Sequence, residues 1–262
     1  MRGIMLETTP IRAETPRYGA SLLFLPELWA PARIWLAVAS FLGHRGWEGQ
    51  LVELRQAGGL EERVAGVVDL ARRLPSPPVL IGHGAWGVVA LEAARAGPAA
   101  AAVLVAPLDP GSAPVRVMTR RWEAIAALLL GRRMSPPGAA AFGSLPATVA
   151  AQLDVETTRA VLDVVRGRPL ASVGQGLAVL VAGGASDPLL PVDAAAALAA
   201  RLMAEHLVIP GAAHWPLVES GWQRTVDLLH RWLVRRLGEP LLELHAESMA
   251  EREGGQDDPD EE

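Results

Sequence analysis

One stretch in the first half of the chain constrains the fold more than any other. Residues 79–90 read VLIGHGAWGVVA, and Pro77 and Pro78 come directly before them. A short apolar run ends at Gly82, and a pattern of Ala, Val, Leu and Glu with helical spacing continues to about Gly97. The pattern predicts a buried strand, a tight turn and a helix.

Apolar runs and helical patterns alternate along most of the chain. After a first segment of 20 residues with at most one or two short strands, further strands are expected at 21–25, 48–54, 101–106, 177–182 and 206–209. Helices are expected at 31–43, 61–74, 192–202 and 221–237. This alternation predicts an α/β fold, with a mostly parallel central sheet and helices on both faces.

The strand pattern lapses in the middle of the chain, where helices are expected over 115–130 and 145–165. The predicted organisation is therefore a core formed by 1–111 and 173–238, with a helical lid at 112–172 over the carboxyl edge of the sheet. Residues 239–262 form a C-terminal extension. Its end, 254–262, consists mostly of Asp, Glu, Gly and Gln and is expected to be disordered.

Composition excludes several classes of function. The chain has no cysteine, and every basic residue is arginine, so thiolate nucleophiles, Cys-based metal sites and Schiff bases on lysine are excluded. The net charge of −5 and the lack of a basic stripe argue against nucleic-acid binding. The apolar runs are too short for a membrane span, and no signal peptide is recognised, so a cytoplasmic setting is expected. No cofactor and no metal site are predicted.

The turn at 82–86 resembles the nucleophile elbow G-x-S-x-G of the α/β-hydrolase superfamily. Here the pattern is Gly82-His83-Gly84-Ala85-Trp86, so glycine stands where the serine nucleophile would be and tryptophan replaces the second glycine. The resemblance extends over roughly residues 20–237. It implies the α/β-hydrolase fold, with Gly84 at the nucleophile position.

Two later loops match the same family in the expected order. Residues 183–191, GGASDPLLP, resemble the loop of the triad acid and place Asp187 there. Residues 209–216, IPGAAHWP, resemble the histidine loop and place His214 there. Taken alone, Asp187 is more readily explained as a turn residue before Pro188, and His214 can be a loop histidine bonded to backbone. In register with the elbow, they are predicted to form a hydrogen-bonded pair beneath the lid.

The departures from the family pattern fall where the chemistry would be. Gly84 supplies no oxygen that a histidine could deprotonate, although glycine adopts the positive φ of an elbow at little cost. The bulk of Trp86 is expected to widen the turn. The first motif strand is followed by Pro26 and Glu27, where the family usually has His-Gly. If Glu27 points into the oxyanion hole, its carboxylate opposes a developing oxyanion and could act as a further acid or base; otherwise it points to solvent.

Tryptophan is abundant, with eight residues against three Phe and one Tyr. Trp29, Trp86 and Trp215 lie in motif loops, and Trp122 lies in the expected lid. These indoles pack in the core, or they line a pocket for a small apolar or aromatic ligand. The motif residues that would complete such a pocket are Leu28, His83 and Ala85.

Two functions of different classes remain open. The first is a non-hydrolytic member of the superfamily that binds a ligand, regulates, or serves a structural role, with a protein partner or a homodimer as further options. The second is a hydrolase or lyase-type enzyme, in which a His214–Asp187 dyad activates water or abstracts a proton. A covalent mechanism through Ser186 or Ser112 ranks third, because neither serine lies on an elbow.

Overall fold

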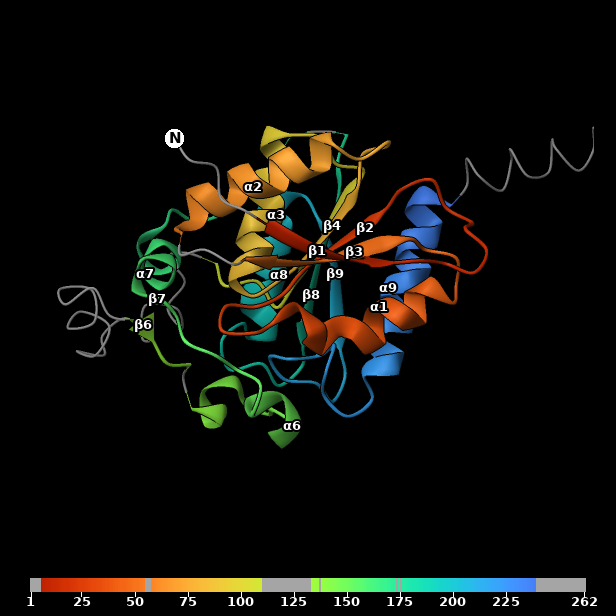
Figure 1. Cartoon of the computed structure of the whole chain (residues 1–262). Helices are drawn as coiled ribbons and strands as arrows, with labels where there is room; N and C mark the ends of the chain where they lie inside the picture. The colour runs from red at the N-terminus through yellow and green to blue at the C-terminus, as the bar shows by residue number, and fades with distance from the viewer. Residues whose placement is uncertain are drawn as a thin grey trace, which may run out of the picture.

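A seven-stranded sheet forms the centre of the molecule (Figure 1). The computed structural model describes residues 6–54, 58–109, 133–136, 138–172, 174 and 176–238. The strand order is β1-β3-β2-β4-β5-β8-β9; β1 pairs with β3 antiparallel, and the other neighbours pair parallel. The strands are β1 (Leu6–Ile11), β2 (Leu22–Leu25), β3 (Gly49–Leu54), β4 (Val79–His83), β5 (Ala101–Val105), β8 (Ala178–Gly184) and β9 (Glu205–Ile209).

Helices cover both faces of this sheet (Figure 1). The 3-10 turn η1 (Ala32–Trp35), α1 (Leu36–Gly43) and α9 (Trp222–Leu237) pack on one face; α2 (Leu60–Arg72), α3 (Ala85–Ala96) and α8 (Val192–Leu202) pack on the other. Because successive side chains of a strand point to opposite faces, Ile81 and Leu80 belong to separate apolar cores. Strands buried on both faces explain the continuous apolar runs of the sequence. The predicted α/β fold is confirmed.

The segment after the gap at 110–132 differs from the expectation. It contains β6 (Arg133–Met134), η2 (Ala139–Phe142), α6 (Ala147–Ala150), β7 (Glu156–Thr157) and α7 (Thr158–Arg166). The single helix expected over 145–165 is wrong, because the chain leaves helical geometry after α6 and pairs β7 with β6 in a separate ribbon. Asp154 fixes that break: its backbone N–H donates to the Trp29 carbonyl at 2.8 Å, and its side chain accepts from the N–H of Val155 at 2.6 Å.

The lid over 112–172 stays a prediction. Its expected first helix at 115–130 lies outside the described residues, as do Trp122 and Ser112. In the part that the structure describes, 133–172 contributes no strand to the central sheet. The acidic end at 254–262 also lies outside the described residues. No described helix is both long and apolar enough to cross a membrane.

The topology brings distant loops together. The parallel strands β2, β4, β8 and β9 all end at the same edge of the sheet, so the segments that follow them meet there. In open α/β sheets, ligands bind in the crevice at this carboxyl edge. The residues singled out in the sequence follow these same strands.

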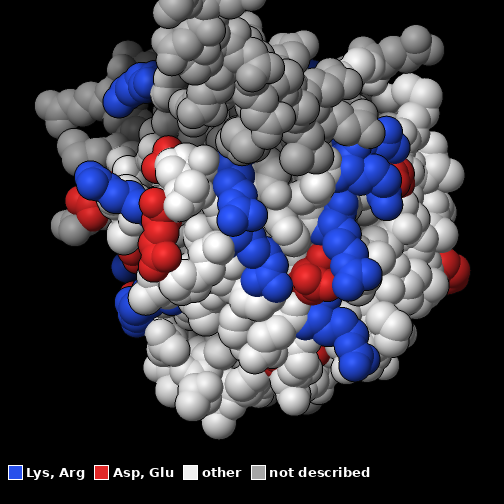
Figure 2. Space-filling model, turned by 90° about the vertical axis from the view of Figure 1, so that its right-hand side faces the viewer, with Lys and Arg blue, Asp and Glu red and all other residues white. Residues whose placement is uncertain are grey.

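The outer side of α9 carries several arginines, seen as blue columns with acidic side chains against them (Figure 2). Glu205, at the start of β9, accepts hydrogen bonds from Trp232 and Arg236 and pairs with Arg235. Burial alone would raise the pKa of Glu205, but these hydrogen bonds and the arginine charges outweigh it and lower the pKa. Glu205 thus fastens α9 to the strand that leads to His214.

The Glu205→Gln variant should be less stable than the parent by about 0.5–1 kcal/mol at pH 7, since the group is partly exposed. A lowered folded-state pKa means that the stabilisation is present above the ordinary value of 4.5 and is lost as the pH falls through the folded-state pKa. Urea unfolding at a series of pH values should therefore show the difference between the two proteins shrinking below pH 4.5. A difference that stays constant down to acidic pH would contradict this assignment.

Candidate active site

The elbow keeps its tight geometry. Gly84 links β4 to α3 with φ 54° and ψ −118°, a conformation that glycine adopts without strain. A Cβ at Gly82 would lie 2.2 Å from the carbonyl oxygen of Trp86, so strand and helix approach closely. The expectation that Trp86 widens the turn is wrong. Its indole turns into the core on the α2 side, where the guanidinium of Arg63 lies 5.2 Å from the ring.

His214 and Asp187 are hydrogen-bonded. His214 Nδ1 lies 3.0 Å from Asp187 Oδ2, and both side chains are fully buried. The other carboxylate oxygen, Oδ1, accepts the backbone N–H groups of Leu189 at 2.8 Å and Leu190 at 3.1 Å. Asp187 therefore faces His214 in a fixed orientation, with both of its oxygens engaged.

Two further residues hold the histidine loop, and the sequence analysis missed both. Glu219 is buried, and its two oxygens accept the N–H groups of Ala213 and Trp215, one on each side of His214, both at 2.8 Å. Phe142 stacks on the His214 ring with centroids 5.5 Å apart. A carboxylate five residues after the histidine was the available signal for Glu219; nothing local pointed to Phe142.

Glu27 points inward. Its side chain is 1 % exposed, and Oε1 accepts the backbone N–H groups of Leu28 at 2.6 Å and Ala85 at 3.1 Å. In this fold, the N–H after the nucleophile position and an N–H from the loop after an earlier strand form the oxyanion hole. The other oxygen, Oε2, lies 3.4 Å from His214 Nε2. The Glu27 carboxylate thus fills the oxyanion hole and faces the histidine.

The same carboxylate occupies the space of a nucleophile. A Cβ built on Gly84 would lie 1.1 Å from Glu27 Oε2 and 2.1 Å from its Cδ. Two atoms cannot share that volume, so no side chain fits at position 84 while Glu27 keeps its place. The inward position of the Glu27 carboxylate therefore depends on glycine at position 84.

The two carboxyl groups beside His214 change its pKa. Burial disfavours the imidazolium, but the hydrogen bond and charge of Asp187, joined by those of Glu27, outweigh burial and raise the pKa of His214 to about 9. For Asp187, burial alone would raise the pKa, yet the hydrogen bond and charge of His214 and two backbone N–H groups lower it. His214 is therefore a cation between two carboxyl groups at neutral pH.

His83 behaves differently from His214, although their ring centroids are only 5.1 Å apart. Burial, the largest effect, and the charge of His214 lower the pKa of His83 to about 4, against an opposing contribution from Glu27. The ring is neutral at pH 7. Its Nε2 lies 2.7 Å from the carbonyl oxygen of His214 and must donate, because a carbonyl only accepts.

The other residues singled out in the sequence lie around this centre in different environments. Leu28 and Ala85 contribute their backbone N–H groups, described above, and their side chains are buried with Trp29 and Trp215 in an apolar cluster. The Trp215 ring meets His83 edge-on at 4.7 Å. Ser186 is exposed beside Asp187, on a loop rather than an elbow.

A cavity of about 330 Å³ adjoins Glu27. Of the residues predicted to line a ligand pocket, Trp29 and Trp86 border it. Its other walls also include the charged residues Arg33, Arg63, Arg133, Glu53, Asp154 and Glu156. The cavity is thus more polar than the sequence suggested, with two indoles among ionic groups.

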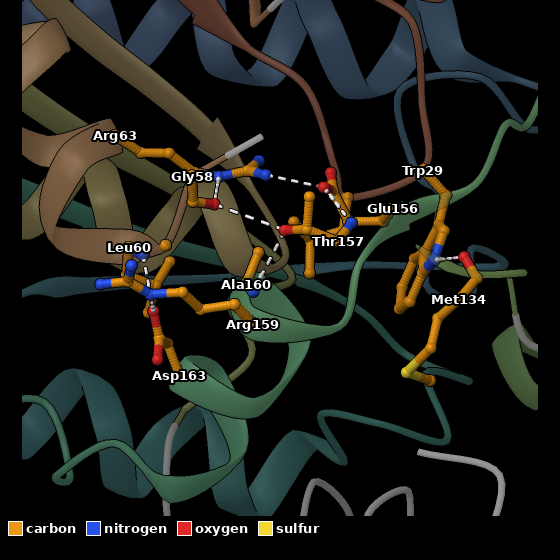
Figure 3. Close-up of polar contacts among 12 residues, drawn as sticks. Trp29, Gly58, Leu60, Arg63, Met134, Glu156, Thr157, Arg159, Ala160 and Asp163 are labelled. Carbon is orange, nitrogen blue, oxygen red and sulfur yellow. Dashed lines mark hydrogen bonds and ion pairs between the residues drawn. The ribbon is translucent and has the colours of Figure 1, made fainter. Parts of the chain in front are cut away.

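The wall of this cavity is tied together by polar contacts (Figure 3). Arg63 is 1 % exposed; it reaches from α2 to the carboxylate of Glu156 at 2.8 Å and to the carbonyl oxygen of Gly58 at 3.3 Å. The Trp29 indole N–H donates to the carbonyl oxygen of Met134 at 3.2 Å. These contacts fix β7 against α2, and segment 133–136 against the loop that carries Glu27.

A parallel sheet with an elbow after β4, followed by an Asp–His pair on the loops after β8 and β9, defines a protein of the α/β-hydrolase fold. The model of the alpha/beta hydrolase family matches residues 16–228, and the chain belongs to that family. Among curated proteins, no sequence is similar enough to this chain to count as a match.

Solved structures share the fold at low sequence identity. A monoacylglycerol lipase from Paleococcus ferrophilus is 15 % identical with a TM-score of 0.66, over 89 % of this chain and 100 % of that one. A thermophilic esterase from Thermogutta terrifontis is 20 % identical with a TM-score of 0.66, over 89 % and 94 %. A structure from a study of carboxylesterases of the ammonia-oxidizing thaumarchaeon Nitrososphaera gargenis is 15 % identical with a TM-score of 0.69, over 91 % of this chain and 98 % of that one.

Proposed function

We propose that this protein is a non-hydrolytic member of the α/β hydrolase family, with a ligand-binding, regulatory or structural role. The observation that carries the proposal is the position of Glu27. Its carboxylate accepts both N–H groups of the oxyanion hole and lies where a nucleophile side chain would start. The structural neighbours include lipases and esterases, but acyl transfer by a serine mechanism needs a nucleophile and a free oxyanion hole.

The cavity beside Glu27 supports a binding role. Its volume of about 330 Å³ is in the range of small-molecule pockets. Trp29 and Trp86 border the cavity with only small exposed parts of their side chains, 4 % and 3 %, and the arginines of its wall offer hydrogen-bond donors. A small ligand with a flat apolar part and a polar edge suits this lining.

An enzymatic alternative rests on one observation, the intact bond between His214 and Asp187. In that case, the dyad would activate water or abstract a proton, with Glu27 as an additional acid or base. Such activity would disappear in a His214→Gln variant. The raised pKa of His214 disfavours this reading at neutral pH, because a protonated imidazole cannot accept a proton.

The test combines a fluorophosphonate probe with ester hydrolysis and thermal-shift screening. The protein should remain unlabelled and should not hydrolyse a short-chain nitrophenyl ester, while a serine esterase treated in parallel is labelled and active. A compound that raises the melting temperature of the parent protein, and does so less for Trp86→Leu, would place the ligand in the cavity. Stoichiometric labelling or turnover that is lost in His214→Gln would refute the non-hydrolytic role.

A further inference from the structure

We propose that Glu27, His83 and His214 form a binding site for one divalent transition-metal ion of the Zn²⁺ type. One ligand atom from each residue lies within 4.8 Å of the other two, and all three side chains are buried. The sequence analysis predicted no metal site, because these residues are far apart in the chain and follow no metal-binding spacing. The inference goes beyond the proposed function: both depend on where Glu27 lies, but metal binding requires neither the presence nor the absence of turnover.

The separation of two of the ligand atoms fits a tetrahedral site. Zn²⁺ binds imidazole nitrogen and carboxylate oxygen at about 2.0–2.1 Å, which places neighbouring ligand atoms of a tetrahedron about 3.3–3.4 Å apart. Glu27 Oε2 and His214 Nε2 are 3.4 Å apart. A cation can therefore bridge these atoms without separating them.

His83 supplies the third ligand and has a free lone pair. Its Nε2 donates to the carbonyl oxygen of His214, so Nδ1 is the unprotonated nitrogen. His83 is 2 % exposed, and in the part of the chain that the structure describes, Nδ1 has no hydrogen-bond partner. A buried nitrogen without a partner is unfavourable, and a metal–nitrogen bond would satisfy it. One ring nitrogen of His83 lies within 4.8 Å of the ligand atoms of Glu27 and His214, up to about 1.4 Å beyond the tetrahedral edge, so the His83 ring must move to coordinate the same ion through its free Nδ1.

The surroundings orient the other two ligands. Asp187 accepts a hydrogen bond from His214 Nδ1, the usual partner of a metal-binding histidine. The N–H groups of Leu28 and Ala85 hold Glu27 Oε1, which leaves Oε2 for the ion. Two imidazoles with one carboxylate favour Zn²⁺, Co²⁺ or Ni²⁺ over Mg²⁺ and Ca²⁺, which prefer oxygen ligands. Water would complete the coordination.

The test is a calorimetric titration of the full chain, treated with chelator and dialysed, with Zn²⁺. The parent protein should bind one equivalent. Glu27→Gln and His83→Phe should each weaken binding at least tenfold, and Asp187→Asn should weaken it about 10–100-fold, as expected for a residue that orients a ligand. Mg²⁺ should give no comparable heat. Circular dichroism would establish that each variant is folded.

The matched control removes two histidines outside the cluster. His44 is exposed, and His245 lies in the C-terminal extension, outside the described residues. A His44→Asn/His245→Asn variant should bind Zn²⁺ like the parent. Loss of binding in this control, or full binding by Glu27→Gln and His83→Phe, would overturn the proposal.

A second measurement needs no variant. Co²⁺ in a four-coordinate site of nitrogen and oxygen ligands absorbs visible light far more strongly than hydrated, six-coordinate Co²⁺. The parent protein should give the intense four-coordinate spectrum with one equivalent of Co²⁺, and Zn²⁺ should abolish it. The spectrum of hydrated Co²⁺ would overturn the proposal, whereas the fluorophosphonate and ester assays would keep their own outcome.

Discussion

The Gly84→Ser variant is expected to show no ester hydrolysis, whereas the Gly84→Ser/Glu27→Gly variant is expected to hydrolyse a short-chain nitrophenyl ester. In the single variant, the serine side chain and the Glu27 carboxylate compete for the same volume, with a Cβ only 1.1 Å from Oε2. In the double variant, the space is open and the N–H groups of Leu28 and Ala85 are free to bind an oxyanion. One such donor lowers the barrier by about 2.7–4 kcal/mol.

The double variant should be more stable than Gly84→Ser, just as it should be more active. Gly84→Ser should unfold with a free energy about 3–5 kcal/mol lower than the parent, because it forces a buried carboxylate away from His214. The double variant should recover part of that loss, which urea unfolding would measure. Glu27→Gly alone is the control for activity, since it opens the hole without adding a nucleophile. Turnover by Gly84→Ser equal to that of the double variant would show that Glu27 does not block the site.

Asp187→Asn should be the most destabilising conservative substitution among the acidic residues, at about 3–5 kcal/mol. The amide would still accept from the N–H groups of Leu189 and Leu190, but it carries no charge to balance the buried His214. The matched control is Asp193→Asn, at the exposed start of α8, which should change stability by less than about 0.5 kcal/mol.

The melting temperature and the urea midpoint of both variants would test this prediction. A similar small change in the two variants would mean that the Asp187–His214 pair contributes little to folding. An Asp187→Asn protein that is strongly destabilised at pH 7 would instead show that the buried charge pair is an integral part of the fold.

The backbone of the site could be predicted from the sequence because its requirements are local. Apolar runs that end in glycine mark β4 and β8, and Gly84 marks a turn with positive φ. Once the elbow was located, the order of the later loops indicated Asp187 and His214. These features depend on patterns within a few residues, which a single sequence displays.

The direction of Glu27 could not be predicted, because it depends on groups far along the chain. The N–H of Ala85 is 58 positions away, and His214 is 187 positions away. The sequence left solvent and the oxyanion hole as equal choices. The helix expected over 145–165 failed for a related reason: its apolar spacing was helical, but contacts of Asp154 with Trp29 favoured an extended chain.

The overlap of Glu27 Oε2 with a side chain at position 84 also sets an order of events. Starting from a family member with serine at the elbow, a glutamate at position 27 could not enter the centre while the serine was present. The serine must therefore be lost before the carboxylate can settle in its place. While the carboxylate occupies this place, a serine introduced at position 84 meets an occupied volume, so a serine elbow requires changes at both positions. Positions 27 and 84 are therefore coupled, since the side chain tolerated at one depends on where the side chain of the other lies.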